Sequence, residues 1–288
     1  MTATDEHGHP HPSRAPLSEQ RISAELARAE WEGHVIVMPE CDSTNAVALR
    51  LPDAELTTHG WAVVAAEKQT AGRGRLGRTW ASPPGAGVTF SVALGVPTHL
   101  PAAQLGLLPL LAGMAVAGVC RADGVTAWVK WPNDVVVPDP DDPADLAKLA
   151  GVLAERGATS AVVGVGLNVS LTAAEAPVPN ATSLVRQGAT SLDRDHLVAA
   201  CAAAILGLWT RLLAGSAAAV MSEFRDICIT IGADVEIHQP GGHRLRGQAT
   251  AVDDHGHLEI TSGEGRSTIV TAGDVIHVRP PEPPELPL

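Results

Sequence analysis

The sequence predicts a mixed α/β domain followed by a small β-barrel. Apolar runs of strand length, such as residues 61–66 and 88–94, alternate with helical segments along most of the chain, which is typical of a sheet covered by helices. After Gly232 the pattern changes to short alternating runs separated by turn residues, which is typical of a small barrel. A chain of 288 residues is long enough to bury one large core and one smaller core.

The first half of the chain contains strands, helices and an expected tail. Residues 1–17 are rich in histidine and proline, so we expect a disordered tail there. Ser18 is a typical N-cap for a helix that reaches residue 29. The next expected elements are a strand at 35–37, a helix at 46–51, a strand at 61–66, a strand at 88–94 and a buried helix within 105–119.

One long stretch raises the question of a membrane span. Residues 88–120 contain no Asp, Glu, Lys or Arg, and a stretch of this length is long enough to cross a bilayer. Gly95, Pro97 and Pro101 interrupt it, and its first third has strand character. A strand followed by a helix buried against a sheet explains the stretch better, so we expect no membrane span.

The second half begins with the run 127–137, expected to be a strand that twists outward at Pro132 and exposes Asn133 and Asp134 at its rim. The acidic loop 138–145 is expected to be a solvated hairpin that points away from the site. Later elements are an apolar run at 161–169, a helix at 196–213, strands at 235–237, 245–252, 257–261, 268–270 and 275–278, and a disordered tail at 281–288. These elements predict domains at 18–230 and 231–280.

Composition excludes several classes of function. A net charge of −12 and a pI near 5.4 argue against a nucleic-acid-binding surface, which needs a broad basic face. The four cysteines lie far apart without C-x-x-C spacing, so we expect free thiols in a reducing cytosol. The N-terminus lacks the basic and apolar regions of a signal peptide. We therefore expect a cytoplasmic protein with no nucleic-acid or membrane partner.

The most unusual segment, residues 72–78, reads Gly-Arg-Gly-Arg-Leu-Gly-Arg. Its glycines match the dinucleotide-binding pattern G-x-G-x-x-G, which requires a following helix and an acidic residue about 20 positions later. Neither is present, because residues 78–85 cannot start a helix and no Asp or Glu occurs between Glu67 and Asp123. The Walker pattern is absent as well. We interpret residues 69–78 as an anion clamp of another kind, in which arginines neutralise a polyanion.

Three further segments carry polar chemistry. Asp42-Ser43-Thr44-Asn45 concentrates small hydrogen-bonding side chains after a strand, which suits a neutral polar head group such as a ureido ring. Lys130-Trp131-Pro132-Asn133-Asp134 combines a base, an aromatic ring, a rigid turn, an amide and an acid in five residues. Lys148 lies three residues before Gly151, a spacing that allows a lysine to reach across a close backbone approach.

These segments, in this order and together with Gly164-Val165-Gly166-Leu167-Asn168-Val169, resemble the biotin–protein ligases. The resemblance is to the monofunctional bacterial form without an N-terminal DNA-binding domain, and it covers roughly residues 20–279. It implies a catalytic domain related to class II aminoacyl-tRNA synthetases, with a mixed central sheet, and an SH3-like C-terminal barrel. It also implies a reaction in which biotin and MgATP form biotinyl-5′-AMP, whose biotinyl group passes to a lysine of an acceptor domain.

The resemblance assigns roles residue by residue. The catalytic residues would be Lys148, Arg73 and Arg75. Biotin would be bound by Ser43, Thr44, Asn45, Gln69, Gly72, Arg73, Gly74, Arg75, Lys148, Gly151, Gly164 and Gly166. ATP or the adenylate would be bound by Arg75, Arg78, Trp80, Lys130, Asn133 and Asn168. Asp134 would orient Lys148 or contribute to a Mg²⁺ site. The expected partner is the biotin carboxyl carrier domain of an acyl-CoA or pyruvate carboxylase, and the expected state is a monomer or weak homodimer.

Alternatives and departures remain at this stage. A lipoate–protein ligase or octanoyltransferase shares the fold, and a biotin-sensing DNA-binding regulator is a non-enzymatic alternative. The chain contains no tyrosine, so stacking and lid roles fall to tryptophans such as Trp80 and Trp131. We also expect the clamp to be mobile without ligand, because its arginines repel one another and its glycines resist ordering.

Overall fold

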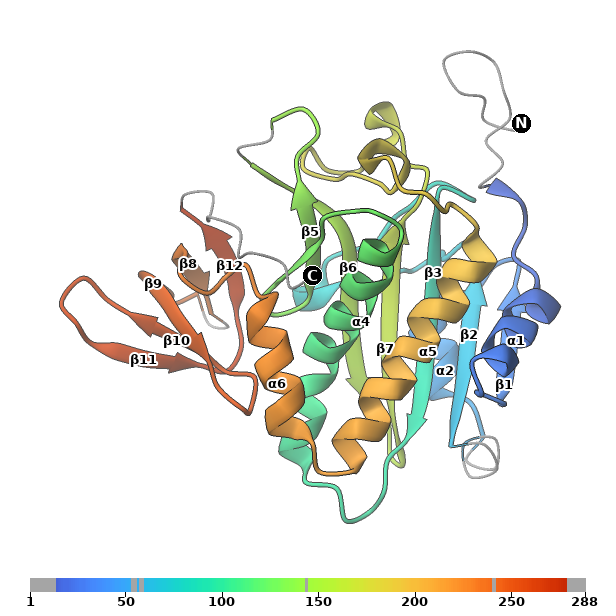
Figure 1. Cartoon of the computed structure of the whole chain (residues 1–288), viewed down its shortest axis with the longest axis horizontal. Coiled ribbons are helices and arrows are strands. Elements are labelled where there is room, and N and C mark those ends of the chain that lie inside the picture. The colour runs from blue at the N-terminus through green and yellow to red at the C-terminus, as the bar shows by residue number, and fades with distance from the viewer. Residues whose placement is uncertain (1–13, 53–55, 57–59, 143–144, 240–241, 279–288) are drawn as a thin grey trace.

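The structure is a computed structural model that describes residues 14–52, 56, 60–142, 145–239 and 242–278 (Figure 1). Within this part of the chain two sheets lie side by side, and helices pack against the larger one (Figure 1). The tails predicted at 281–288 and over residues 1–13 lie outside the described residues.

The larger sheet has seven strands in the order β1-β2-β3-β7-β6-β5-β4. Strands β1 and β2 pair in parallel, and every other neighbouring pair is antiparallel, so the sheet is mixed as predicted. The strands are β1 (His34–Met38), β2 (Trp61–Ala66), β3 (Gly87–Gly95), β4 (Trp128–Lys130), β5 (Asp134–Pro138), β6 (Leu146–Arg156) and β7 (Ser160–Asn168).

Two long apolar helices, α4 (Leu108–Ala122) and α5 (Arg194–Leu213), pack side by side on one face of this sheet (Figure 1). By length and composition, residues 102–122 and α5 would suffice to cross a membrane, but just over half of each segment (56%) is buried inside the fold. Their apolar residues belong to the main core, as expected for core helices. Helix α1 (Glu19–Arg28) flanks α5, and Ser18 caps it as predicted.

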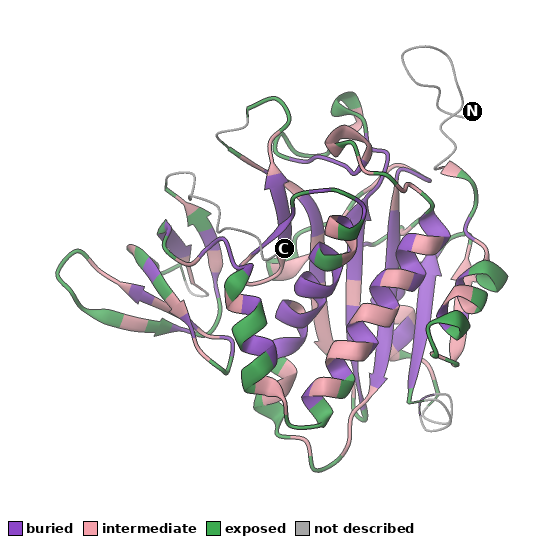
Figure 2. Cartoon of the chain, viewed as in Figure 1, coloured by how far each residue is buried: buried purple, intermediate pink, exposed green. Residues whose placement is uncertain are grey.

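The opposite face of the sheet carries the short helix α2 (Thr44–Leu49). Strand residues alternate between the two faces, so β3, β6 and β7 present apolar side chains to α4 and α5 and a different set to the α2 face. The central strands are buried almost throughout (Figure 2). On the α2 face several aligned positions are small or polar, namely Ser91, Gly151, Gly164 and Gly166. This face is therefore the one that leaves room for a ligand.

The second sheet contains five antiparallel strands in the order β11-β10-β9-β8-β12. They are β8 (Asp234–His238), β9 (Arg244–Val252), β10 (Leu258–Thr261), β11 (Ser267–Val270) and β12 (Asp274–His277), close to the five predicted runs. No ladder joins β11 to β12 within the described residues. Helix α6 (Ala217–Asp226), which the sequence analysis did not predict, leads into this sheet (Figure 1).

The prediction of one twisted strand over 127–137 is wrong. The run forms the hairpin β4–β5, with a turn at 131–133 that pairs Lys130 with Asp134. The turn places Asn133 and Asp134 beside β6, so both reach the α2 face. The Trp131 ring is buried, and its indole N–H donates to the Gly256 carbonyl at 2.9 Å, joining the two sheets. A lid role for Trp131 is therefore excluded by its packing.

Residues 14–17 were predicted to be part of the disordered tail, and this boundary is also wrong. The Arg14 guanidinium donates to both carboxylate oxygens of Glu175 at 2.7 and 3.0 Å and to the Ser170 carbonyl at 2.9 Å. Leu17 is buried, and its backbone N–H donates to Glu67 at 2.5 Å. These long-range contacts fasten the segment across the end of the sheet, which its local composition does not reveal.

Candidate active site

A cavity of about 670 Å³ opens on the α2 face of the large sheet. Its floor is formed by β6 and β7, and its walls come from the start of α2, the Gly/Arg clamp, the β4–β5 turn and strand β12. It is lined by nearly all of the residues predicted to bind ligand: Ser43, Thr44, Asn45, Gln69, Arg73, Gly74, Arg75, Arg78, Trp80, Lys130, Asn133, Asp134, Lys148, Gly151, Gly164, Gly166 and Asn168. Segments separated by more than 100 residues thus meet at one place.

Two floor glycines make room for side chains of the protein itself. A Cβ at Gly164 would lie 2.2 Å from the Asn45 amide oxygen, and a Cβ at Gly166 would lie 2.2 Å from the Trp80 ring. Both distances are far below van der Waals contact, so any side chain there would displace Asn45 or Trp80. The prediction that these glycines let backbone approach the ligand is therefore modified, because Asn45 and Trp80 already fill the space above them.

The clamp is a closed loop over the cavity. A bridge pairs Arg73 with Thr79, and the tip turns through a short 3₁₀ segment at 75–77. Leu76 adopts a left-handed backbone with φ of 55° and exposes its side chain. Gly72 lies behind the cavity wall, where a Cβ would lie 2.4 Å from the Trp80 carbonyl oxygen. Gly72 therefore shapes the loop from behind, while Arg73 reaches the cavity directly.

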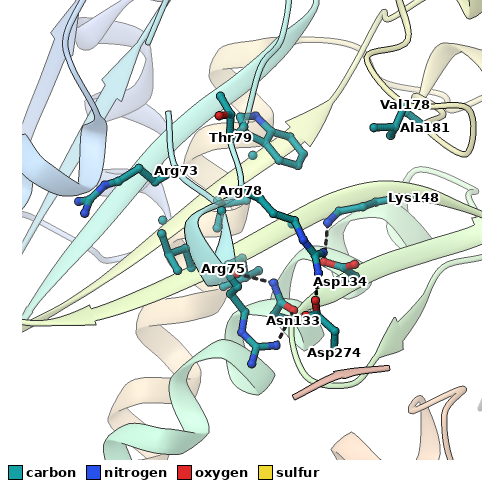
Figure 3. A pocket seen from close by; sticks show the side chains of 18 of the residues that line it. Arg73, Arg75, Arg78, Thr79, Asn133, Asp134, Lys148, Val178, Ala181 and Asp274 are labelled. Carbon is teal, nitrogen blue, oxygen red and sulfur yellow. Dashed lines mark hydrogen bonds and ion pairs between the residues drawn. The ribbon is translucent and has the colours of Figure 1, made fainter. Parts of the chain in front are cut away.

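Each clamp arginine has a partner in the protein, and Figure 3 shows the partners of Arg75 and Arg78. Arg73 forms an ion pair with Glu155 at 3.0 Å, and Arg78 forms one with Asp274. Arg75 donates to the side-chain oxygen of Asn133 at 3.2 Å and to the Gly273 carbonyl at 3.3 Å. Burial lowers the pKa of the Arg75 guanidinium, and nearby Asp134 opposes this shift. In this state the clamp is thus tied to both sheets by groups that an anionic ligand can replace.

Lys148 projects from β6 into the centre of the cavity (Figure 3). Its ammonium group lies 2.6 Å from the Asp134 carboxylate and 5.7 Å from the centre of the Trp80 ring. The lysine backbone is held from the other side, because its N–H donates to the Asn180 carbonyl at 2.6 Å. Asp134 therefore lies within contact distance of Lys148, where it can orient the ammonium group, and this role stays a prediction.

Lys130 lines the cavity beside this pair. Burial lowers the pKa of its ammonium group, with an opposing effect from Asp134 and a further lowering from Lys148. Burial together with Lys130 also lowers the pKa of His277 to about 4. The cavity therefore gathers several cationic groups with few carboxylates to balance them, and a polyanionic ligand relieves that imbalance.

A small polar pocket lies at the other end, at the start of α2. Ser43, Thr44 and Asn45 are all buried. Thr44 donates its backbone N–H to the Gln69 side-chain oxygen at 2.8 Å, which fixes that amide beside the pocket. The Asn45 amide donates to the Leu153 carbonyl at 3.1 Å and to Glu155 at 2.8 Å. The pocket thus offers neutral hydrogen-bonding groups held in fixed orientations.

Several residues of the site were not predicted. Asp274 and the Gly273 carbonyl reach the clamp from the second sheet, and Ser91 and Glu155 hold Asn45 in place. Ser91 had a weak signal, since it and Thr89 are the two polar residues in a run at 88–94 that is otherwise apolar. The partnership of Asp274 with Arg78 had none, because nearly 200 residues separate the two positions.

Within the described residues, no group of three or more His, Cys, Asp or Glu side chains is placed to hold a metal ion. The carboxylate proposed for that role, Asp134, is committed to Lys148. The expectation that Asp134 contributes to a Mg²⁺ site therefore gains no support from the geometry.

Comparisons with known proteins identify the family of this chain. The sequence profile of the biotin/lipoate A/B protein ligase family matches residues 37–171. The biotin–[acetyl-CoA-carboxylase] ligase of Mycobacterium tuberculosis is 36% identical over 274 residues, which span 92% of this chain and 97% of that protein. The bifunctional ligase/repressor BirA of Bacillus subtilis is 28% identical over 89% of this chain and 78% of its own length.

A solved structure shows the same fold. Biotin protein ligase from Aquifex aeolicus, determined in complex with biotin and ATP, superimposes with a TM-score of 0.70 and 25% sequence identity. The superposition covers 85% of this chain and 99% of the Aquifex chain. The chain therefore belongs to the biotin/lipoate A/B protein ligase family.

Proposed function

We propose that the chain is a biotin–protein ligase. It activates biotin with ATP to biotinyl-5′-AMP and pyrophosphate, and then transfers the biotinyl group to a lysine of a biotin carboxyl carrier domain. One observation carries the proposal: a single cavity joins a neutral polar pocket at Ser43 and Thr44 to a cluster of cationic side chains around Lys148. The relatives from Mycobacterium and Aquifex, named for this activity, support it.

The cationic half of the cavity answers the main physical difficulty of the first step. The biotin carboxylate must attack the α-phosphorus of a triphosphate that is itself anionic. Two unit charges about 4 Å apart repel by roughly 4 kcal/mol at an effective dielectric constant of about 20. Arg73, Arg75 and Lys148 lie where they can offset this repulsion and the charge that builds on the phosphorus.

The roles of the individual residues follow from their positions. Ser43, Thr44 and Gln69 contact the ureido ring, and Asn45 supports them because both of its amide hydrogens are donated within the protein. Lys148, oriented by Asp134, contacts the biotin carboxylate and later the acyl-phosphate oxygen. The adenylate is held by groups at the other end of the cavity, namely Arg75, Arg78, Trp80, Lys130, Asn133 and Asn168.

Magnesium enters this reaction as part of the MgATP substrate. Mg²⁺ commonly keeps several waters and binds through substrate phosphates and at most a few carboxylates. The cavity has no cluster of acidic ligands among the described residues that would retain the ion without the nucleotide. Every step assigned to the protein therefore rests on its own cationic and polar side chains.

The proposal also covers the domain organisation, the carrier partner, the cellular location and the oligomeric state. Residues 18–230 form the catalytic domain, related to class II aminoacyl-tRNA synthetases, and residues 231–280 form an SH3-like barrel. The strand order of the five-stranded sheet supports the second assignment. The carrier domain belongs to an acyl-CoA or pyruvate carboxylase, and the enzyme acts in the cytoplasm as a monomer or weak homodimer without nucleic-acid or membrane partners.

ATP–pyrophosphate exchange tests the proposal against its closest alternative. The purified chain is incubated with MgATP, labelled pyrophosphate and either biotin, lipoate or octanoate. We expect exchange with biotin and little with the other two acids, followed by biotin transfer to a carrier domain. Exchange that favours lipoate would instead assign the chain to lipoate ligation, and octanoyl transfer from a carrier without ATP would assign it to octanoyl transfer.

A further inference from the structure

Beneath the polar pocket, Ser91 and Glu155, which have no role in the proposed reaction so far, join Thr44 and Asn45 in one row of side chains. Ser91 on β3 is completely buried, and its hydroxyl oxygen lies 2.6 Å from the Asn45 amide oxygen and 2.8 Å from the Thr44 hydroxyl oxygen. The Asn45 amide nitrogen lies in turn 2.8 Å from the Glu155 carboxylate. Thr44, Ser91, Asn45 and Glu155 thus form a continuous row, which we call the Ser91 relay.

The direction of the hydrogen bonds in the Ser91 relay follows from counting protons. The Glu155 carboxylate accepts, so the Asn45 amide nitrogen donates to it and the Asn45 amide oxygen faces Ser91. An amide oxygen accepts but does not donate, so the single Ser91 proton is committed to Asn45. The Thr44 hydroxyl oxygen lies 2.8 Å from the Ser91 hydroxyl oxygen and 3.2 Å from the Gln69 side-chain oxygen. Two hydroxyl oxygens 2.8 Å apart need a proton between them, so the Thr44 proton belongs to the shorter contact, with Ser91.

This direction decides what Thr44 presents to a ligand. With its proton turned inward to Ser91, the Thr44 oxygen offers lone pairs to the cavity and acts as an acceptor. Beside it, the Gln69 oxygen is occupied by the Thr44 backbone N–H, which leaves the Gln69 amide nitrogen as a donor. An acceptor next to a donor matches a cyclic urea, whose N–H and C=O groups are adjacent.

We propose that the Ser91 relay determines head-group specificity, because it fixes Thr44 as a hydrogen-bond acceptor and so selects a ligand that carries an N–H group there. The inference rests on the proposed function and adds positioning roles for Ser91 and Glu155. It separates the two substrate classes for which the family is named. A dithiolane ring has no N–H, so it would leave the buried Thr44 acceptor unpaired, which is costly.

The relay also connects recognition of the head group with the clamp. The Glu155 carboxylate that receives the Asn45 hydrogen bond lies 3.0 Å from Arg73, one of the two arginines expected to close over the biotin carboxylate. One acidic side chain therefore anchors both the ureido pocket and the clamp. Glu155 is partly buried between the two, with 22% of its side chain exposed.

Ser91→Ala tests the proposal through biotin–dependent ATP–pyrophosphate exchange. We expect the KM for biotin to rise about tenfold, which corresponds to about 1.4 kcal/mol. The KM for ATP and the kcat should stay within about twofold, because the relay touches the pocket end of the cavity. Ser91→Cys, which keeps a weaker donor of similar size, should give an intermediate biotin KM.

Thr89→Val is the matched control. Thr89 lies on the same face of β3, is also buried, and donates its hydroxyl to the Ala66 carbonyl at 2.9 Å, outside the relay. Thr89→Val should lower the melting temperature about as much as Ser91→Ala does, while its KM for biotin stays unchanged. A biotin KM that rises equally in Thr89→Val and Ser91→Ala would show a general structural effect and overturn the proposal.

A double-mutant cycle isolates the route through Thr44. If Ser91 acts by orienting the Thr44 hydroxyl, Ser91→Ala should change the biotin KM by less than twofold in a Thr44→Val background. A full tenfold effect in that background would overturn the proposal. Wild-type protein that fails to activate biotin at all would refute the proposed function, whereas normal activation with an unchanged KM in Ser91→Ala would refute the relay alone.

Discussion

Two glycines on strand β7 are predicted to support different halves of the active site. Gly166→Ala should impair ATP binding, and Gly164→Ala should impair biotin binding. A Cβ at Gly166 would lie 2.2 to 2.5 Å from three atoms of the Trp80 indole, and a Cβ at Gly164 would lie 2.2 Å from the Asn45 amide oxygen. Ordinary contacts of a Cβ lie at 3.4–4 Å, so each neighbour must move by more than an ångström. The two positions are two residues apart and share one face of the sheet.

The size of each effect depends on how far the Trp80 ring and the Asn45 side chain can move. The Trp80 ring is rigid and packs over Gly151 and Lys148 as well, so it must tilt away from the floor. Overpacking of this kind costs about 1–3 kcal/mol, which corresponds to a rise of roughly 5- to 150-fold in the KM for ATP. The shorter Asn45 side chain must rotate and lose its bonds to Leu153 and Glu155, so Gly164→Ala should raise the KM for biotin about tenfold or more.

The assay is ATP–pyrophosphate exchange with each substrate titrated separately. Gly118→Ala is the control, because Gly118 is an exposed residue of helix α4 with open space at its Cβ position. Alanine there should leave both KM values unchanged and slightly raise the melting temperature, since alanine favours helix. The reasoning is refuted if Gly166→Ala and Gly164→Ala raise the same KM, or if Gly166→Ala binds ATP normally.

Four further predictions concern the clamp, the central lysine and the N-terminal segment. Arg75→Gly should release the adenylate faster and label nearby lysines nonspecifically, and an unchanged dissociation rate of the adenylate would contradict this. Amide exchange over residues 70–80 should be slower with bound adenylate than without ligand; equal protection would argue against a mobile clamp. Lys148→Arg should lower the rate of adenylate formation about 100-fold or more, because a planar guanidinium cannot follow the moving oxygen as a point charge does; near-normal single-turnover formation would remove Lys148 from the chemistry. Arg14 lowers the pKa of Glu175 to about 2 from 4.5, so this pair contributes stability above about pH 4.5 that is lost as the pH falls towards 2. Arg14→Met should therefore cost on the order of 2 kcal/mol of stability at pH 7 and flatten the fall of the melting temperature with decreasing pH. Plots of melting temperature against pH that run parallel for the two proteins would refute the pairing.

The sequence singled out many of the residues that line the cavity because its motifs are chemically unusual. Alternating glycine and arginine at 72–78 has few structural uses besides an anion clamp, and Lys130 to Asp134 carries too many functional groups for an ordinary strand. The cavity brings both segments together with Lys148. The family resemblance led us to expect that these segments meet at one site. The pairing of β5 with β6 is the physical reason that Asp134 and Lys148 do so.

The errors arise where distant contacts decide the structure. The runs 127–129 and 135–137 are apolar on either side of Lys130 to Asp134, so periodicity alone does not reveal the hairpin turn between them. Residues 14–17 have the composition of a tail and are held in place by distant partners such as Glu175, Ser170 and Glu67. The pairing of Arg78 with Asp274 depends on how the second sheet sits against the first, which no local pattern encodes.

The acidic loop illustrates an intermediate case. It was expected to point away from the site, and its described residues 138–142 and 145 do not line the cavity. Asp141 instead pairs with Arg186 at 2.5 Å on the outside of the fold. A simple electrostatic argument, that acidic groups oppose triphosphate binding, was sufficient here because it needed no knowledge of the packing.

Direct detection of the mixed anhydride is the decisive measurement for the whole account. A known concentration of purified protein is mixed with an excess of radiolabelled biotin and MgATP in the absence of a carrier domain, quenched, and analysed for biotinyl-5′-AMP. If the cationic side chains neutralise both reacting anions, each active site should form one adenylate and hold it until a carrier lysine is added. A protein that binds both substrates and yet produces no adenylate would show that the charge arrangement around Lys148 serves another purpose.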